Sequence, residues 1–332
     1  MLAPEGLNLA RYHFHFRVTE PLRLSEYAGS ALRGVFGRAL MQLSGLQMGD
    51  VKDKTPLFLH SPYAEVFEPQ ARPDASGILA SLSDVPPLYV VEAPINGQRF
   101  LEEDDDFSFS VVLIGQALAH LPLIILAWRR ALLMGLGKDR GGRAELMLVE
   151  HELSGGELVS IYSEEKPLVQ SHGTNLELPN FAAAADVHLH LLTPLRLQQQ
   201  GRVLGAKDIT PALFLRQLVR RTSIYCQMQQ SDAINPEVIA QLNQLADSVS
   251  ADEKRLSFQQ WARYSARQQQ LMQMNGVQGH WLLRKVPPEM QQLLWLGQYL
   301  HVGKGTVYGL GGYVISQQQW QPSTQRNLEN AV

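Results

Sequence analysis

Cysteine is almost absent from this sequence, which has one thiol, Cys226, in 332 residues. A single cysteine cannot form an intramolecular disulfide or supply a cysteine-rich zinc site, so both kinds of stabilisation are excluded. The N-terminal residues also lack the pattern of a cleavable signal peptide. These features predict a protein of the reducing cytoplasm.

Long uninterrupted apolar runs are missing too. The most apolar stretch, Val111–Met134, contains Gln116, His120 and Pro122 and carries the pair Arg129-Arg130 near its end. A membrane span of about 20 residues tolerates few such groups. We therefore expect a buried helix here, and no membrane as a partner.

An excess of positive charge is absent as well, because 29 basic and 32 acidic residues give a formal net charge of −3. Residues 1–150 hold 14 basic and 18 acidic residues, or −4, and residues 151–332 hold 15 and 14, or +1. A general nucleic-acid binder is usually strongly basic. Any nucleic-acid surface of this chain must therefore be a local patch.

An internal repeat is the first positive signal. His13–Phe16 leads into Pro21–Leu24, and His188–Leu191 leads into Pro194–Leu197, so each half has an alternating strand followed by the same letters, PLRL. The alternation buries one face of each strand. A copy that recurs half a chain later predicts two related domains.

Helix-start signals follow these strands. We expect Ser25 to cap a helix in the first half, and Thr210-Pro211, Asn235-Pro236 and Pro288 to open helices in the second. Strands and helices in this order predict an α+β protein with two tandem ferredoxin-like (RRM-like, βαββαβ) domains. The expected parts are the domains 1–180 and 181–316 and a polar tail or linker, 317–332.

Residues 301–313, HVGKGTVYGLGGY, hold five glycines within ten residues. Glycine permits positive φ and lets a backbone approach a phosphate closely, and Lys304 adds a cation. Neither a Walker motif nor a dinucleotide fingerprint fits, because the segment precedes a strand and does not open a helix. An ordinary turn is the alternative. The expected phosphate contacts are Lys304, Gly303, Gly305, Gly309 and Gly311.

This segment resembles the C-terminal glycine-rich loop of the RAMP superfamily, and specifically of the CRISPR-associated precursor-crRNA endoribonucleases, the sixth Cas family. The resemblance extends over most of the chain, to about Ile315. Five further segments that resemble this family are residues 27–37, 57–69, 113–122, 193–197 and 261–268.

The resemblance implies binding of a CRISPR repeat in precursor crRNA and one cut at a fixed place, without metal or another cofactor. The implied reaction is attack of a ribose 2′-OH on the adjacent phosphate, which gives a 2′,3′-cyclic phosphate and a 5′-OH. Such a reaction needs a base, an acid and a cation. Other Cas proteins of an effector or adaptation complex are further implied partners.

The expected catalytic residues are His301, where a helix meets the glycine-rich segment, and Tyr27 and Arg33 at the start of the first helix. Members of the family often carry a histidine in or near that helix. Here the helix has none, and Arg38 is the position that we compare with it and expect to contact RNA. The structural alternatives are a helix C-terminal histidine that satisfies carbonyls and a core tyrosine.

Two further cationic clusters have aromatic or cationic neighbours. Backbone contact combined with base stacking is typical of RNA-binding surfaces, and solvated helix faces are the alternative. The expected RNA contacts are Arg220 and Arg221, with Arg216 one turn earlier, and Arg263 and Arg267, beside Trp261 and Tyr264.

A metal site is not expected. His13 and His15 share one strand face, as do His188 and His190, but no carboxylate or cysteine accompanies them at ligand spacing. Two other functions remain open. One is a non-catalytic RAMP subunit that holds crRNA in an effector complex, and the other is a scaffold without an RNA role that uses its strand edges.

Overall fold

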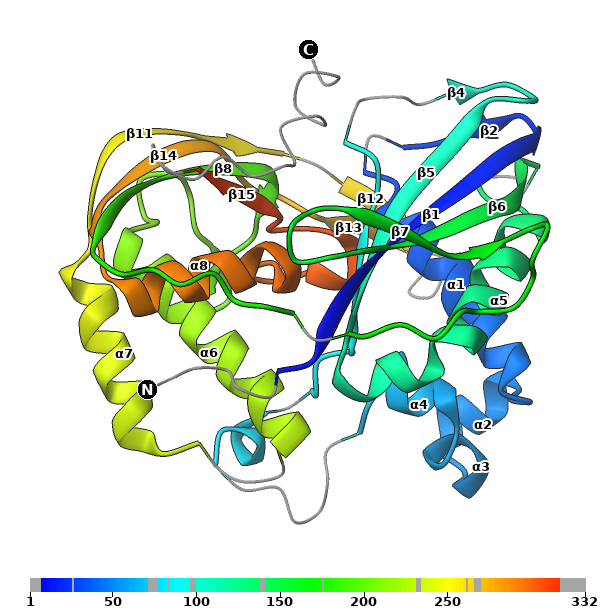
Figure 1. Ribbon diagram of the computed structural model, residues 1–332, viewed down its shortest axis with the longest axis horizontal. Helices are drawn as coiled ribbons and strands as arrows, with labels where there is room; N and C mark the ends of the chain where they lie inside the picture. The colour runs from blue at the N-terminus through cyan, green and yellow to red at the C-terminus, as the bar shows by residue number, and fades with distance from the viewer. Residues whose placement is uncertain are drawn as a thin grey trace. The chain divides into compact units, whose positions relative to one another are not determined.

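The computed structural model describes residues 7–25, 27–70, 77–82, 84–95, 100–137, 141–174, 176–230, 234–260, 262–265 and 270–316. The chain forms two compact units (Figure 1). The N-terminal unit contains Gly6–Glu177 and Gln227–Asp232, and the C-terminal unit contains Leu178–Cys226 and Ala233–Gln325. The domain limits expected from the sequence, 1–180 and 181–316, stay a prediction. The expected tail, 317–332, lies outside the described residues.

The N-terminal unit contains a five-stranded antiparallel sheet in the order β3-β5-β1-β6-β7. Helix α1 follows β1, and α5 follows β5 (Figure 1). The elements of the sheet and its helices are β1 (Leu9–Glu20), α1 (Gly29–Leu43), β3 (Tyr89–Glu92), β5 (Asp106–Ile114), α5 (Leu121–Leu133), β6 (Arg143–Glu152) and β7 (Leu158–Ser163).

Shorter elements fill the connections of this unit. A two-stranded ribbon pairs the residues after β1 with those before β5. The short elements are β2 (Leu22–Arg23), α2 (Met48–Asp53), α3 (Pro56–Leu59), α4 (Pro62–Val66), η1 (Leu79–Ser81), β4 (Phe100–Leu101) and η2 (Gly115–His120).

The core of the N-terminal unit is aromatic. Phe14 on β1 stacks on Phe109 of β5 with ring centroids 5.7 Å apart, and Phe36 on α1 stacks on Trp128 of α5 at 4.5 Å. All four side chains are buried. Burial of large aromatic side chains is a major source of folding free energy, so this cluster fixes both helices against the sheet.

The C-terminal unit contains a four-stranded antiparallel sheet in the order β11-β14-β8-β15. Its elements are β8 (Ala185–Leu195), α6 (Pro211–Gln230), α7 (Pro236–Ser248), β11 (Ser250–Gln259), β14 (Gly276–Val286), α8 (Pro288–Leu300), η3 (Thr306–Tyr308) and β15 (Tyr313–Ser316). Two short ribbons add β9 (Gln198–Gln199) with β10 (Arg202–Val203), and β12 (Ala262–Ser265) with β13 (Gln270–Gln273).

Both units therefore have the same βαββαβ plan. In each, the first and third strands of the plan pair in the middle, and the second and fourth flank them. This arrangement confirms the predicted tandem ferredoxin-like fold. The repeated motif is the first strand of each unit, β1 or β8. On β8, Leu189 and Leu191 are buried and His188 and His190 are exposed, as the alternation predicted.

Three predicted helix starts are confirmed. Helices α6, α7 and α8 begin at Pro211, Pro236 and Pro288. The Asn235 side chain accepts the amide of Glu237 at 2.9 Å, which satisfies an otherwise unpaired donor of the first turn.

The predicted cap of the first helix is wrong. Helix α1 begins at Gly29 with Ala28 as its N-cap residue, and no side chain caps it. Ser25 donates its hydroxyl to the carbonyl of Tyr27 at 3.2 Å instead. A short local turn competes successfully for the serine hydroxyl.

The apolar stretch Val111–Met134 is the end of β5, the turn η2 and then α5, so it is not one long helix. Pro122 lies in the first turn of α5, where its missing N–H costs no hydrogen bond. Within the described ranges, every helix is too short or too polar to span a bilayer.

Candidate nucleic-acid interface

The glycine-rich segment forms an irregular loop between α8 and β15, and we call residues 301–312 the glycine loop. The loop is fastened to the end of β8, at the second copy of the PLRL motif. Lys304 donates its amide to the carbonyl of Arg196 at 2.8 Å, and Gly311 donates its amide to the carbonyl of Pro194 at 3.0 Å. The loop therefore follows the strand exit along its length.

Thr193 adds a side-chain clasp to these backbone contacts. Its Oγ1 donates to the carbonyl of Gly309 at 2.7 Å and accepts the amide of Gly312 at 2.8 Å. Thr193 is buried, so water does not compete for these bonds. The sequence did not single out this threonine, although it lies inside the segment 193–197 that resembles the family.

Two glycines are required by the geometry of the loop. Gly303 has a φ of +89°, and a β-carbon there would lie 2.5 Å from the carbonyl oxygen of Arg196. Gly311 has a φ of +70°, and a β-carbon there would overlap the carbonyl of Val302. Any larger residue would break the contact between the loop and the strand.

The exposed part of the glycine loop is short. Lys304 is exposed, and Gly303, Gly305 and Tyr308 are half-exposed. In the described part of the chain, no hydrogen bond engages the amides of Gly305, Thr306 and Val307. This tip, residues 303–308, offers the Lys304 cation and the unpaired N–H groups of the half-exposed Gly305 and Val307 to an anion, whereas Thr306 is buried.

Gly309 and Gly311 do not belong to this exposed tip, because both are buried. Their contact with RNA stays a prediction. Gly309, which has a φ of +83°, ends the 3₁₀ turn η3, and Gly311 packs on the carbonyl of Val302. These two glycines shape the loop, and Gly303, Gly305 and Lys304 present its outer surface.

His301 is buried at 4% exposure in the middle of the loop anchor. It is the C-cap residue of α8, with a φ of +58°, and its Nδ1 lies 3.2 Å from the carbonyl oxygen of Leu310. Its ring packs where a β-carbon of Gly312 would otherwise lie. In this conformation the imidazole packs inside the loop, and the catalytic role of His301 stays a prediction.

Arg220 and Arg221 have different surroundings on α6. Arg220 is exposed, and no hydrogen bond or ion pair reaches it within the described chain. Arg221 is half-buried and donates to the carbonyl of Leu300 and to the hydroxyls of Tyr225 and Thr306. Arg216 forms an ion pair with Asp247. Arg220 is therefore a surface cation, whereas Arg221 makes contacts inside the C-terminal unit.

The remaining predicted residues of the first helix belong to the N-terminal unit. Tyr27 precedes α1 and is half-exposed, as are Arg33 and Arg38 within it. The guanidinium carbon of Arg33 lies 4.2 Å from the centre of the Phe67 ring, a cation–π contact. Arg33 therefore has a packing role at the helix surface in addition to its charge.

The last predicted cationic pair is described in part. Arg263 lies on β12 opposite Met272 of β13. The side chain of Arg263 and the whole of Arg267 lie outside the described residues.

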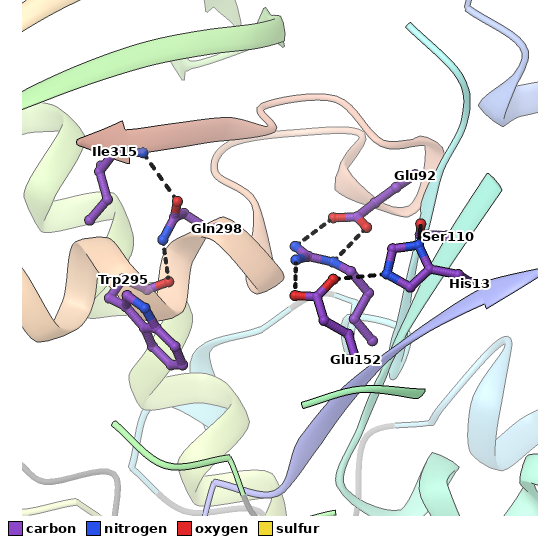
Figure 2. A network of polar contacts seen from close by, with 8 residues as sticks. His13, Glu92, Ser110, Glu152, Trp295, Gln298 and Ile315 are labelled. Atoms are coloured by element: carbon purple, nitrogen blue, oxygen red, sulfur yellow. Dashed lines mark hydrogen bonds and ion pairs between the residues drawn. The ribbon is translucent and has the colours of Figure 1, made fainter. Parts of the chain in front are cut away.

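A polar network joins strands β1, β3, β5 and β6 of the N-terminal sheet (Figure 2). The imidazole of His13 lies 2.8 Å from a carboxylate oxygen of Glu152 and 2.9 Å from the hydroxyl of Ser110. Arg11 bridges Glu152 and Glu92 at 3.0 Å each. Burial acts to raise the pKa of Glu152, but the Arg11 charge and the His13 hydrogen bond lower it below its usual value.

The histidines of the second copy of this strand have different neighbours. His15 on β1 pairs with Glu150 at 2.9 Å, whereas His190 on β8 faces His280 with ring centroids 6.4 Å apart. Burial and the neighbouring His280 lower the pKa of His190. Among the described residues, no group of three or more histidine, cysteine or carboxylate side chains is arranged to hold a metal ion.

Within the C-terminal unit, Gln298 ties β15 to α8 (Figure 2). Its amide donates to the carbonyl of Trp295 at 3.2 Å and its oxygen accepts the amide of Ile315 at 3.1 Å. Gln298 thus joins the helix that precedes the glycine loop to the strand that follows it.

Two family models match the chain, and each covers one ferredoxin-like unit. Residues 7–174 match the family AF_1859_N, described as an N-terminal domain, and residues 189–313 match the CRISPR-associated endoribonuclease Cas6. The second match includes the glycine loop and most of the C-terminal sheet. The C-terminal unit of the chain therefore carries the domain of the Cas6 family of CRISPR-associated endoribonucleases.

Solved structures share this fold. A partial Cas6-RT-Cas1–Cas2 complex superposes with a TM-score of 0.55 at 14% identity, covering 94% of this chain and 46% of that one. Cas6 of Thermus thermophilus gives 0.53 at 16% identity and covers 93% of this chain and 99% of that one. A Cas6 product complex gives 0.53 at 16% identity, with 93% and 100% covered. At these identities the likeness shows the fold alone.

The chain spans under half the length of the Cas6-RT-Cas1–Cas2 chain that it matches. No curated protein matches the chain in sequence.

Proposed function

We propose that this protein binds CRISPR repeat RNA and cleaves precursor crRNA by a metal-independent transesterification. The observation that carries the proposal is the tip of the glycine loop, where an exposed Lys304 lies beside the unpaired amides of residues 305–307. A phosphodiester oxygen is the ligand that suits such a group of donors. The match of residues 189–313 to the Cas6 endoribonuclease family supports the choice of RNA and of strand cleavage.

In the proposed reaction, the ribose 2′-oxygen bonds to the adjacent phosphorus and the bond from phosphorus to the 5′-oxygen breaks. The proton of the 2′-OH passes to a base, and the leaving 5′-oxygen receives a proton from an acid. The products are a 2′,3′-cyclic phosphate and a 5′-OH. Lys304 and the loop amides would stabilise the charge that develops on the phosphate oxygens.

Tyr27 is the proposed proton-transfer residue, because its side chain is half-exposed and His301 is buried. Arg33 and Arg38 are proposed RNA-binding cations of the N-terminal unit, since they follow Tyr27 by about two and about three helical turns. Arg220 is the proposed phosphate contact on α6. Arg263 and Arg267 stay predictions.

The proposal is tested by incubating the purified protein with labelled repeat RNA in EDTA. A single cut that disappears when the ribose at the cut site is 2′-deoxy supports the mechanism, and replacing Tyr27 with Phe should slow that cut. Cleavage that continues on the 2′-deoxy substrate would exclude the proposed chemistry.

A second function has a specific structural reason. The first helix contains no histidine, and the imidazole of His301 is buried, so neither this helix nor the glycine loop presents an exposed imidazole as a base. A non-catalytic RAMP subunit would bind repeat RNA tightly and leave it intact in the same assay. The name of the Cas6-RT-Cas1–Cas2 assembly also suggests other Cas proteins as partners.

A scaffold without an RNA role is the remaining alternative. It predicts that RNA binding does not respond when Lys304 and Arg220 are replaced by alanine. Phosphate contacts make binding dependent on charge and on salt. A loss of affinity in the double variant would therefore count against the scaffold.

A further inference from the structure

Arg221 joins three parts of the C-terminal unit through its guanidinium group. Its Nε donates to the carbonyl of Leu300 at 2.8 Å. Its Nη2 donates to Thr306 Oγ1 at 2.7 Å and to the Tyr225 hydroxyl at 3.1 Å. An arginine has five N–H donors in a fixed fork, and three of them are engaged here.

Two of these contacts lie on either side of Lys304 in the sequence. Leu300 is the last residue of α8, immediately before the loop, and Thr306 opens the turn η3 inside it. Lys304 and the unpaired amides lie between the two contacted residues, Leu300 and Thr306, or next to Thr306. Thr306 is buried, and its hydroxyl accepts a charge-assisted hydrogen bond. Such bonds are stronger than bonds between neutral groups, so the single side chain of Arg221 can hold this part of the loop firmly.

The direction of the guanidinium argues against a phosphate contact by the same residue. Arg221 is half-buried, its planar group lies 5.1 Å from the centre of the Tyr225 ring, and its donors point at protein oxygens. Arg220, one residue earlier, faces another direction because successive helical residues are rotated by about 100°. The two arginines carry the same charge but only one touches the loop.

We infer that Arg221 is a positioning residue, which holds the tip of the glycine loop in its RNA-binding conformation without contacting RNA itself. This inference rests on the proposed RNA-binding function. A loop that is ordered before binding loses less conformational entropy on binding, so Arg221 raises affinity through preorganisation. A lysine cannot replace it, because a single ammonium cannot reach three acceptors in this planar arrangement.

The test compares affinity for labelled repeat RNA over a range of KCl concentrations. Each phosphate contact adds about 0.7 to the slope of log affinity against log salt for a single strand. We expect Arg221→Ala to lower affinity about tenfold or more with an unchanged slope, and Arg221→Lys to do the same. Lys304→Ala provides the contrasting result, a lower affinity with a shallower slope.

Arg220→Ala removes the same charge from the same helix and is the comparison: as a proposed phosphate contact, Arg220 should lower both the affinity and the salt slope when it is replaced, whereas Arg221→Ala should leave the slope unchanged. If Arg220→Ala and Arg221→Ala give equal losses with equal slopes, charge alone explains the effect and the inference is overturned. An unchanged affinity in Arg221→Ala overturns it as well.

Thr306 provides a second route to the same conclusion. Thr306→Val removes the acceptor and keeps the shape, whereas Thr306→Ser keeps the acceptor. We expect Thr306→Val to reproduce the loss of affinity and Thr306→Ser to bind nearly as the wild type. A Thr306→Val protein with wild-type affinity would contradict the inference even if Arg221→Ala failed to fold.

Amide hydrogen exchange separates this inference from the proposed function, since it needs no RNA. The amides of Lys304 and Leu310 are hydrogen-bonded to Arg196 and Gly305. Arg221→Ala should raise their exchange rates while leaving those of β8 unchanged. If this holds and no variant binds RNA, the positioning role stands and the proposed function fails. If Arg221→Ala leaves the amide exchange rates of the loop unchanged, the positioning role is contradicted.

Discussion

The hydroxyl of Thr193 donates to the carbonyl of Gly309 at 2.7 Å, and this bond connects residues 116 positions apart in the chain. The same oxygen accepts the amide of Gly312. One buried side chain on the first strand of the C-terminal unit thus determines the path of the loop before its last strand.

We predict that Thr193→Val destabilises the protein by about 1–3 kcal/mol, because it leaves a buried carbonyl and a buried amide without partners while keeping the side-chain shape. Thr193→Ser retains the hydroxyl and should lose less. Urea unfolding of the three proteins measures the difference. Equal stability of Thr193→Val and the wild type would show that water replaces the two hydrogen bonds of the Thr193 hydroxyl.

A pair of glycine substitutions should change stability in opposite directions. Gly311→Ala forces a β-carbon onto the Val302 carbonyl at a φ of +70° and should destabilise by more than about 1 kcal/mol. Gly34→Ala, on the exposed side of α1 with open space around it, should stabilise by about 0.5–1 kcal/mol. Thermal melting distinguishes these outcomes, and a destabilised Gly34→Ala would contradict the account of the helix.

His151 makes folding sensitive to mild acid. Burial, and then the nearby His172, lower the pKa of His151 from 6.5 to about 4. The folded state therefore prefers the neutral imidazole, so the stability contributed above pH 6.5 is lost as the pH falls from 6.5 toward 4.

We expect the wild type to lose about 1 kcal/mol through this group between pH 7 and pH 5, after allowance for solvent screening. His151→Gln should lose correspondingly less over the same interval. Urea unfolding at the two pH values provides the measurement. The same pH dependence in both proteins would place the acid sensitivity elsewhere, for example at His190.

Lys304→Ala should weaken binding of repeat RNA and reduce the salt slope by about 0.7, because one phosphate contact is lost. Lys207→Ala removes an equally exposed lysine of the same unit and is the control. Fluorescence anisotropy at several salt concentrations gives both quantities. Equal effects of the two substitutions would indicate a diffuse charge effect and no specific contact.

Much of the fold could be predicted because its signals are local. Asn235-Pro236 opens α7 with the side-chain oxygen on the first-turn amide, and the alternation on β8 buries Leu189 and Leu191. Because the strand motif with its PLRL exit occurs twice, the sequence also predicts two related units. Ser25 was misjudged because a hydroxyl can serve either a helix end or a tight turn, and the sequence does not decide between them.

The site was harder to predict because its contacts are distant in sequence. Arg221 and Thr306 meet only after α6 and the loop pack in the same unit, and the spacing of residues gives no sign of it. His301 was judged by its place next to the glycines, but its burial depends on how the loop folds back onto β8. Burial and partner choice are tertiary properties that a linear pattern does not contain.

The attachment of the glycine loop to β8 has a consequence for synthesis. Bringing together segments more than a hundred residues apart carries a loop-closure cost that is recovered when β15 joins the sheet. During synthesis, residues 301–312 leave the ribosome before β15 does, so the strand that follows the glycine loop can pair with β8 only after the whole loop has been made.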